Sequence, residues 1–281
     1  MTPFQYCQNK VLHEGSSLYY SLHVLSPTQR KILIAIHAFF REINEIPCEC
    51  QDLSIVQMKL QWWQHEIAQT FNGEAHHPIC QVLSEAIQHH LEENYFQEFI
   101  EGVRQHLNVT RYATDKDLET YCKQTGVVST LLCTQVLGYQ NESTLKYAEQ
   151  LGIALQLTFL LRELHQDLAN GRLYIPTEDL ERFKVTEQAL FNYQLSDTVQ
   201  ALLAYQVVRI RAYYHEAFKH LAKEDVFNQR SGVIRAKLAL ATLQEIENDG
   251  YQVFNHRISL TPLRKLWIAW RTNRWAKRQQ F

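Results

Sequence analysis

The chain has few glycines and prolines, and both shortages narrow the functions that it can have. Nine glycines occur in 281 residues, and the sequence contains no P-loop, no dinucleotide-binding glycine pattern and no G-x-S-x-G motif. Nucleotide-binding and nucleophile-elbow enzymes need such glycines for their tight turns. We therefore exclude these two classes. The six prolines leave two long proline-free stretches, which favour long helices.

An excess of charge of one sign and long apolar runs are also lacking. The 28 basic and 30 acidic residues give a formal net charge of −2, so the overall charge does not attract nucleic acid. No window approaches the roughly 20 consecutive apolar residues of a membrane-spanning helix. Met1 to Lys10 lacks the basic and apolar regions of a signal peptide. We expect a cytoplasmic protein that binds no nucleic acid.

The cysteines and histidines form no recognisable redox or metal motif. Cys48 and Cys50 are separated by one residue, whereas a C-x-x-C pair has two between its thiols. His76-His77 and His89-His90 are adjacent pairs, and neighbours on a helix diverge by about 100°. Neither pair can easily share one metal ion. The six cysteines are too few for a secreted disulfide scaffold, which indicates a reduced compartment.

Apolar residues recur at helical spacing along most of the chain, which predicts an all-α fold. No linker, repeat or low-complexity tract divides the sequence. We therefore predict a single domain, residues 1–281, built as a helical array around a central cavity. The expected helices span about 28–46, 52–72, 79–91, 93–107, 115–137, 142–169, 187–221, 231–250 and 261–279.

Two carboxylates, Glu163 and Asp167, are the first candidates for a site. They lie four residues apart in the expected helix 142–169, so both side chains project from one face, one turn apart. Such a pair can share a divalent cation. An isolated pair with this spacing is more often a solvated acidic edge, and the spacing alone leaves both alternatives open.

The segment from Leu151 to Leu180 resembles the second aspartate-rich motif of the squalene/phytoene synthase family. That motif reads A-L-Q-L-T-N-I-L-R-D-x-x-x-D, followed by G-R-x-Y-x-P-x-E-D-L. Further matches extend over nearly the whole chain, and the sequence is most similar to the bacterial branch linked to hopanoid and squalene formation. They are Tyr6-Cys7, Gly15 to Ser21, Ala38 to Glu42, Leu60 to Glu66, Tyr121-Cys122, Gly250 to Phe254 and Arg264 to Leu266.

The resemblance implies an isoprenoid-synthase fold, with prenyl tails at the base of a cavity and diphosphates at its mouth. It implies a transferase that uses Mg²⁺ to condense two farnesyl or geranylgeranyl diphosphates head to head, and NADPH where the product is squalene. It assigns catalytic roles to Tyr121, Arg162 and Tyr174. It places Ser17, His37, Arg41, Gln156 and Phe159 at substrate-binding positions.

The first aspartate-rich motif departs from the family pattern. The family's D-D-x-x-D falls on Asn44, Glu45, Ile46, Pro47 and Cys48, so both outer carboxylates are missing. Glu45 and Glu49 keep a four-residue spacing, but each lies one position later, a rotation of about 100° around the helix. We also expect Pro47 to disrupt the helix. Glu45 and Glu49 are either rearranged metal ligands or ordinary surface charges.

Other departures lie where the family places polar groups. Phe159 stands at an asparagine position, and its ring cannot coordinate Mg²⁺. Glu163 replaces an aspartate, and the extra methylene moves the carboxylate by about one C–C bond. His37 stands where an aromatic hydroxyl is usual. Arg41 and Arg162 either bind phosphate or pair with Glu42, with Glu163 or with the carboxyl ends of helices.

The expected helix at about 261–279 is basic and amphipathic. Six basic residues and no acidic residue occur between Arg264 and Arg278. Leu263, Leu266, Trp267 and Trp270 are spaced along one helical stripe. This helix either lies on an anionic membrane, which would make the protein peripheral at the inner membrane, or packs its stripe on the body of the protein.

Two functions remain after these steps. In the first, the chain has drifted from condensation to a non-catalytic role as a prenyl-lipid-binding protein, as a partner of an active family paralogue, or as an assembly factor. In the second, it is an active Mg²⁺-dependent prenyltransferase in which Glu163 and Asp167 act with Glu45 and Glu49. We favour the first, because a departing pyrophosphate needs several positive charges, and a Mg²⁺ site stripped of carboxylates loses the ion.

Overall fold

The computed structural model describes residues 1–50, 52–87 and 91–279, and these confirm the all-α prediction. Their single strand-like feature is an isolated bridge between Arg111 and Leu173. Whether the chain forms one domain stays a prediction. The α-helices are α1 (Pro3–Val11), α2 (Ser17–Leu22), α3 (Pro27–Glu49), α4 (Leu53–Phe71), α5 (Pro78–Ser84), α6 (Glu93–Gln105), α7 (Asp115–Cys122), α8 (Val128–Leu137), α9 (Ser143–Arg162), α10 (Leu164–Ala169), α11 (Thr177–Phe183), α12 (Glu187–Phe191), α13 (Asp197–His220), α14 (Arg230–Asn248) and α15 (Pro262–Lys277).

Local sequence explains several helix starts. Ser26 caps α3 by accepting a hydrogen bond from the Gln29 amide, directly before Pro27. Asp52 caps α4 and Thr261 caps α15 in the same manner. In contrast to our expectation, Pro47 does not end α3, which continues to Glu49. Pro47 lies in the last turn, where the lost hydrogen bond is near a helix end that already has unpaired groups.

Three of the expected helices are interrupted. The range 142–169 is divided at Glu163 into α9 and α10. The range 115–137 contains a π-helical segment, η2 (Lys123–Val127), between α7 and α8, and the range 187–221 contains the turn between α12 and α13. The expected helix 79–91 ends earlier, at Ser84, and its His89-His90 pair lies outside the described residues.

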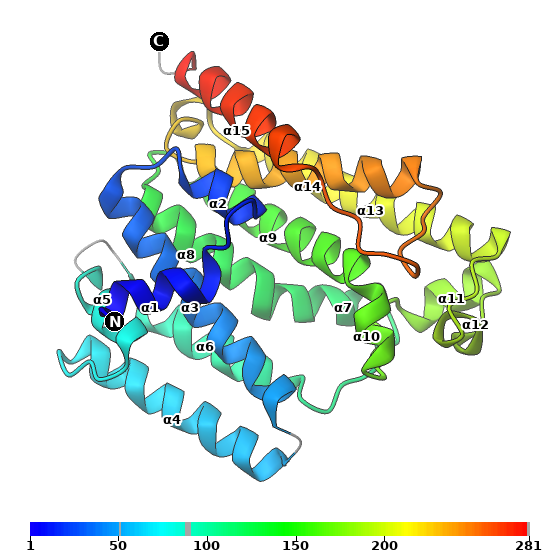
Figure 1. Cartoon of the computed structure of the whole chain (residues 1–281), viewed down its shortest axis with the longest axis horizontal. Helices are drawn as coiled ribbons and strands as arrows, with labels where there is room; N and C mark the ends of the chain where they lie inside the picture. The colour runs from blue at the N-terminus through cyan, green and yellow to red at the C-terminus, as the bar shows by residue number, and fades with distance from the viewer. Residues whose placement is uncertain (51, 88–90, 280–281) are drawn as a thin grey trace.

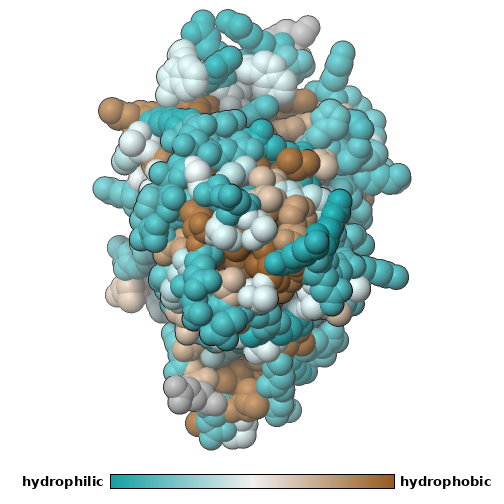
Figure 2. Space-filling view, turned by 90° about the vertical axis from the view of Figure 1, so that its right-hand side faces the viewer, coloured by the Kyte–Doolittle hydropathy of each residue, from teal (hydrophilic) through white to brown (hydrophobic). Residues whose placement is uncertain are grey.

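Helix α9 runs through the middle of the array, where it packs against α8, η2, α13 and α14 (Figure 1). The N-terminal α2 lies beside α14 and α15, although more than 200 residues separate them in sequence (Figure 1). Figure 2 shows the end of the molecule that carries α11 and α12, whose surface is mostly hydrophilic around a small hydrophobic area. None of the helices in the described ranges has the length and apolar character that crossing a membrane requires.

Two large apolar clusters form the core. One joins α1, α3, α4, α5, α6 and α8, and the other joins α7, α9, α13 and α14. Each fully buried Leu or Ile side chain in them contributes about 1.5–3 kcal/mol of burial free energy. Side chains from both clusters line the space between α3, α8, α9 and α14. The candidate site lies in this space.

Candidate functional site

A cavity of about 170 Å³, called here the central cavity, lies between α3, α6, η2, α8, α9 and α14. Close backbone approach shapes one wall: a Cβ added at Gly152 would lie 2.5 Å from Val127 Cα, and one at Gly126 would lie 2.6 Å from Gly152 O. The residues that line the cavity are Phe40, Asn44, Phe99, Thr125, Gly126, Ser129, Thr130, Gly152, Leu155, Gln156, Phe159 and Arg235.

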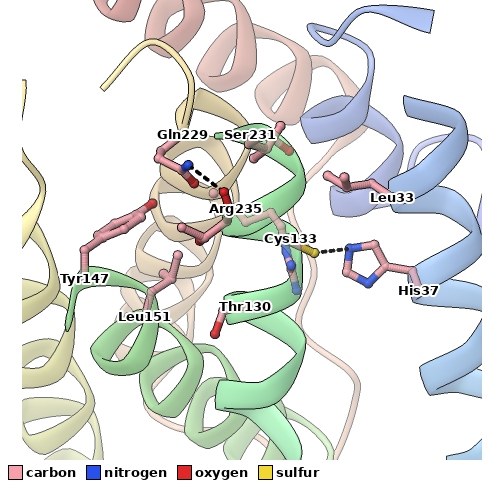
Figure 3. A pocket seen from close by; sticks show the side chains of 12 residues that line it. Leu33, His37, Thr130, Cys133, Tyr147, Leu151, Gln229, Ser231 and Arg235 are labelled. Carbon is pink, nitrogen blue, oxygen red and sulfur yellow. Dashed lines mark hydrogen bonds between the residues drawn. The ribbon is translucent and has the colours of Figure 1, made fainter. Parts of the chain in front are cut away.

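A smaller pocket of about 20 Å³, called here the inner pocket, shares Thr130 and Arg235 with the central cavity. Figure 3 shows Arg235 extending from α14 toward the space between Thr130 and His37. The His37 Nε2 atom lies 3.9 Å from Cys133 Sγ. Burial and the Arg235 charge hold the pKa of His37 well below its usual value, so this imidazole is neutral at physiological pH.

Three of the predicted substrate-binding residues lie at these two cavities. Gln156 and Phe159 line the central cavity, and His37 lines the inner pocket. Phe159 is 48% exposed and its ring lies under the Arg162 guanidinium, 5.8 Å from the centroid, so it stands at the mouth. Ser17 is the first residue of α2 and does not line either cavity as described.

Arg41 is bound by neighbouring protein groups. Its guanidinium donates to the Lys10 carbonyl at 2.7 Å and to Glu45 Oε1 at 2.6 Å, and it lies 2.8 Å from His13 Nε2. The interaction with the Lys10 carbonyl satisfies the C-terminal end of α1. The alternative that Arg41 pairs with protein groups is therefore borne out for a helix carboxyl end, and its carboxylate partner is Glu45 in place of Glu42.

The carboxylates of the first motif are also paired. Glu45 accepts from Lys10 at 2.5 Å and from Arg41, and these partners outweigh burial in lowering its pKa. Glu49 lies 3.9 Å from the Lys59 ammonium on α4. Asn44 lines the central cavity, and Cys48 is exposed.

The glutamate of the second motif, Glu163, is also paired with basic side chains. The helix is broken at Glu163, and Oε1 of this residue accepts from Arg162 Nε at 2.9 Å and from Arg257 Nη2 at 2.6 Å. Arg257 reaches it from the segment between α14 and α15, a contact that no local sequence pattern indicates. Of the alternatives for Arg162, pairing with Glu163 is present in the structure.

Asp167 has a different environment. Its Oδ2 atom is buried and has no hydrogen-bond partner among the residues that the structure describes. Burial, opposed by the Arg172 charge and reinforced by Glu163, raises the pKa of Asp167 to about 7. A substantial fraction of Asp167 is therefore protonated at neutral pH.

These four carboxylates do not form a donor set that fits Mg²⁺. Three of them already neutralise basic side chains, and the fourth is partly protonated. Within the described ranges, no group of three or more His, Cys, Asp or Glu side chains is placed to hold a metal ion. Because Mg²⁺ needs several oxygen donors at near-octahedral positions, Glu45, Glu49, Glu163 and Asp167 stay predicted ligands.

Tyr121 and Tyr174, two of the predicted catalytic residues, belong to an aromatic cluster. Their ring centroids are 5.3 Å apart, Tyr112 stacks on Tyr174 at 5.6 Å, and His106 contacts Tyr121 edge to face at 4.9 Å. Burial and the Tyr174 hydroxyl raise the pKa of Tyr121 well above its usual value. These hydroxyls can donate hydrogen bonds but do not ionise at physiological pH. Their catalytic role stays a prediction.

Helix α15 corrects one expectation about the C-terminal stripe. The small residues Ala269, Thr272 and Ala276 face the body, whereas the predicted apolar stripe is exposed. Its exposed large side chains are Leu263 (78%), Leu266 (52%), Trp267 (53%) and Trp270 (54%). Arg271 and Arg274 lie over the Trp267 and Trp270 rings, at 5.1 and 5.5 Å.

Comparison with known proteins gives concordant results. A family model described as squalene/phytoene synthase matches residues 11–264. A 15-cis-phytoene synthase from Synechococcus elongatus is 27% identical over 278 residues, which cover 94% of this chain and 90% of that protein. That of a Synechocystis species is 26% identical, with coverage of 95% and 84%.

Solved structures show the same fold. The crystal structure of a dehydrosqualene synthase in complex with ligand superposes with a TM-score of 0.87 at 23% identity, covering 98% of this chain and 97% of that one. A squalene synthase from Alicyclobacillus acidocaldarius gives a TM-score of 0.78 at 24% identity, with coverage of 89% and 94%. At these identities the likeness is one of fold.

Proposed function

The chain belongs to the squalene/phytoene synthase family, and from that premise we propose that it is a non-catalytic member that binds a prenyl lipid. The observation that carries this proposal is the pairing of the motif carboxylates with basic side chains. Ionisation of a prenyl diphosphate leaves a pyrophosphate whose charge Mg²⁺ must offset. Mg²⁺ would have to displace Lys10, Arg41, Arg162 and Arg257 to gain its ligands.

The interior of the array supports the same proposal in two ways. Ionisation of the C–O bond generates an allylic carbocation, and the charge of Arg235 on the cavity wall opposes another positive charge beside it. In addition, a cavity of about 150 Å³ holds a molecule of the size of benzene. The central cavity has about 170 Å³, whereas two farnesyl chains together are several times larger than benzene.

The deciding experiment is a product assay with radiolabelled farnesyl and geranylgeranyl diphosphates. It is run with Mg²⁺ or Mn²⁺, with and without NADPH, on wild-type protein and Asp167→Ala. We expect no squalene, phytoene or cyclopropyl diphosphate from protein that circular dichroism shows to be folded, and no saturable Mg²⁺ binding. Metal-dependent product that Asp167→Ala abolishes would overturn the proposal in favour of an active prenyltransferase, which the phytoene synthase relatives favour.

We further propose that α15 rests on an anionic lipid bilayer. Helix α15 combines three exposed tryptophans, Trp267, Trp270 and Trp275, with basic side chains, and interfacial aromatic rings together with cations are typical of helices that lie on membranes. Arg264 is held by Glu245 at 2.6 Å and Lys265 by the Gly15 carbonyl at 2.9 Å, so these two anchor the helix to the body. The remaining basic residues can each contribute about 1 kcal/mol near an anionic surface.

Vesicle sedimentation tests this contact. We expect wild-type protein to pellet with phosphatidylcholine vesicles that contain phosphatidylglycerol, less so at high salt, and to stay in solution with phosphatidylcholine alone. The double variant Trp267→Gln, Trp270→Gln should lose most of the binding. Trp62→Gln is the matched control, since Trp62 is 47% exposed on the distant α4. Equal losses in both variants would contradict the role of α15.

A further inference from the structure

Arg235 lacks a counterion inside the array. It lines both the central cavity and the inner pocket, and it makes no hydrogen bond or ion pair within the described part of the chain. Arg230, one turn earlier on α14, shows the contrast: its guanidinium donates to the Val24 carbonyl at 3.0 Å and the Phe227 carbonyl at 2.7 Å. Arg235 is partly buried, and a cation at such a position without protein partners would gain an ion pair from a ligand that supplies the opposite charge.

The cavity walls around Arg235 suit an anion. No aspartate or glutamate lines either cavity over the described residues. The side chains of Asn44, Ser129 and Gln156 line the central cavity and form no hydrogen bonds within the same residues, so their donors are available. In the inner pocket, the fully buried Tyr147 hydroxyl also has no partner (Figure 3). His37 is neutral and adds no second cation.

The rest of the central cavity is apolar. Phe40, Phe99 and Leu155 line it, and Phe159 stands half exposed at its mouth. The volume of about 170 Å³ accommodates a head group and a short part of one chain, comparable to a cavity that holds benzene. A longer chain would therefore continue past Phe159 to the surface.

We propose that the central cavity binds a single-chain amphipathic anion without metal, with a carboxylate or phosphate head group on Arg235 and an isoprenoid-like tail that runs past Phe159. The guanidinium supplies paired donors to either head group, and Gln156 and Ser129 supply neutral donors beside it. This inference rests on the proposed lipid-binding function, because it names the class of ligand and the residue that recognises it.

Isothermal titration calorimetry in the presence of EDTA tests the proposal. The probes are farnesoic acid, farnesyl monophosphate and the uncharged farnesol, which share one tail. We expect at least one anionic probe to bind more tightly than farnesol, and the stronger of the two identifies the head group. Arg235→Met should weaken its binding by about tenfold or more, since charge-assisted hydrogen bonds are lost.

Lys237→Met is the matched control. It removes one positive charge from the exposed face of the same helix, where the ammonium lies over the Phe218 ring at 4.8 Å, so the affinity should not change. Arg41→Met tests the rival location of the head group, near the first motif. If Arg41→Met weakens binding and Arg235→Met does not, the head group lies at that location and our inference is wrong, although the lipid-binding function stands.

Two further outcomes separate the inference from the function on which it rests. Binding of farnesol that equals binding of both anions would overturn the inference alone. Binding of no probe would overturn both. Thermal unfolding provides the folding control: because Arg235 has no protein counterion, Arg235→Met should have an equal or higher Tm. If that variant does not fold, Arg235→Lys replaces it in the test. Arg235→Lys keeps the positive charge but loses the paired donors of the planar guanidinium, so it should bind the anion more weakly than wild type and about as tightly as a single charge allows.

Discussion

At the scale of single residues, Asp167 has the environment with the clearest consequence. Its carboxyl is partly buried, one oxygen lacks a partner among the described residues, and burial raises its pKa to about 7. An exposed aspartate has a pKa of about 3.9. The folded protein therefore binds this proton more tightly than the unfolded chain does. The resulting stabilisation is fully present below about pH 4 and is lost as the pH rises through 7.

The variant Asp167→Asn should consequently have an effect that depends on pH. The amide cannot ionise, so the variant should be more stable than wild type at pH 8, by about 2 kcal/mol. This value is roughly half of the free energy that corresponds to a rise in pKa from about 3.9 to about 7, because the side chain is partly open to solvent. At pH 4 the two proteins should differ little. Urea unfolding at both pH values measures this, and an equal effect at pH 4 and pH 8 would contradict the assignment.

Residue-scale prediction from sequence succeeded for neighbours and missed distant partners. The Arg162–Glu163 pair follows from adjacency and is present. Lys10 beside Glu45, and Arg257 beside Glu163, come from segments about 35 and 94 residues away. Arg235 had no signal, because a single arginine in an amphipathic helix is usually on the solvated face. Such contacts depend on packing between helices, which local spacing does not specify.

At the scale of helices, the apolar periodicity predicted the long elements well and their interruptions poorly. Helices α3, α4, α6, α14 and α15 begin and end close to the expected residues, and side-chain caps mark the starts of α3, α4 and α15. The break at Glu163 lies inside an uninterrupted helical pattern, and α11 follows a proline in a segment outside the expected helices. The π-helical segment η2 coincides with the contact between Gly126 and Gly152, which apolar spacing does not encode.

The contact between Gly126 and Gly152 predicts whether a substitution at Gly152 stabilises or destabilises the protein. In an open helix, Gly→Ala stabilises by up to about 1 kcal/mol. At Gly152 the new Cβ would lie 2.5 Å from Val127 Cα, a backbone atom that cannot move away easily. We expect Gly152→Ala to destabilise the protein by about 2 kcal/mol, measured by urea unfolding. Glu149→Ala, at an exposed position of the same helix, should change stability by less than about 0.5 kcal/mol. A stabilising effect of Gly152→Ala would mean that η2 and α9 are farther apart.

At the scale of the whole molecule, the helical array and its central cavity were predictable from the sequence. The charges and the pairing of the side chains around the cavity were not. The family resemblance covers most of the chain, and the fold is shared with structures of 23–24% identity. Fold conservation at this level does not preserve the site. Two features of the site bear on the proposed loss of catalysis: Glu45 and Glu163 are paired with basic side chains, and the partly buried Arg235 cation lines the central cavity.

These two features of the site can be altered separately by substitution. Asn44→Asp, Cys48→Asp and Phe159→Asn together restore the family's polar residues at the mouth, and they should produce Mg²⁺ binding, seen as a rise in Tm with added Mg²⁺. We expect this triple variant to remain without product from farnesyl diphosphate, because the Arg235 charge still opposes the carbocation. Adding Arg235→Leu removes that opposition, and the quadruple variant should show the first metal-dependent ionisation, detected as released pyrophosphate.

The matched control for this series is the triple variant combined with Lys237→Met, which removes a charge from the outer face of α14. If the triple variant alone ionises farnesyl diphosphate, the Arg235 charge does not prevent the chemistry, and the missing carboxylates alone would account for the inactivity that we propose. If the quadruple variant binds Mg²⁺ and still releases no pyrophosphate, the limit is geometric, since a cavity of about 170 Å³ would then be too small to seat even one substrate chain for ionisation.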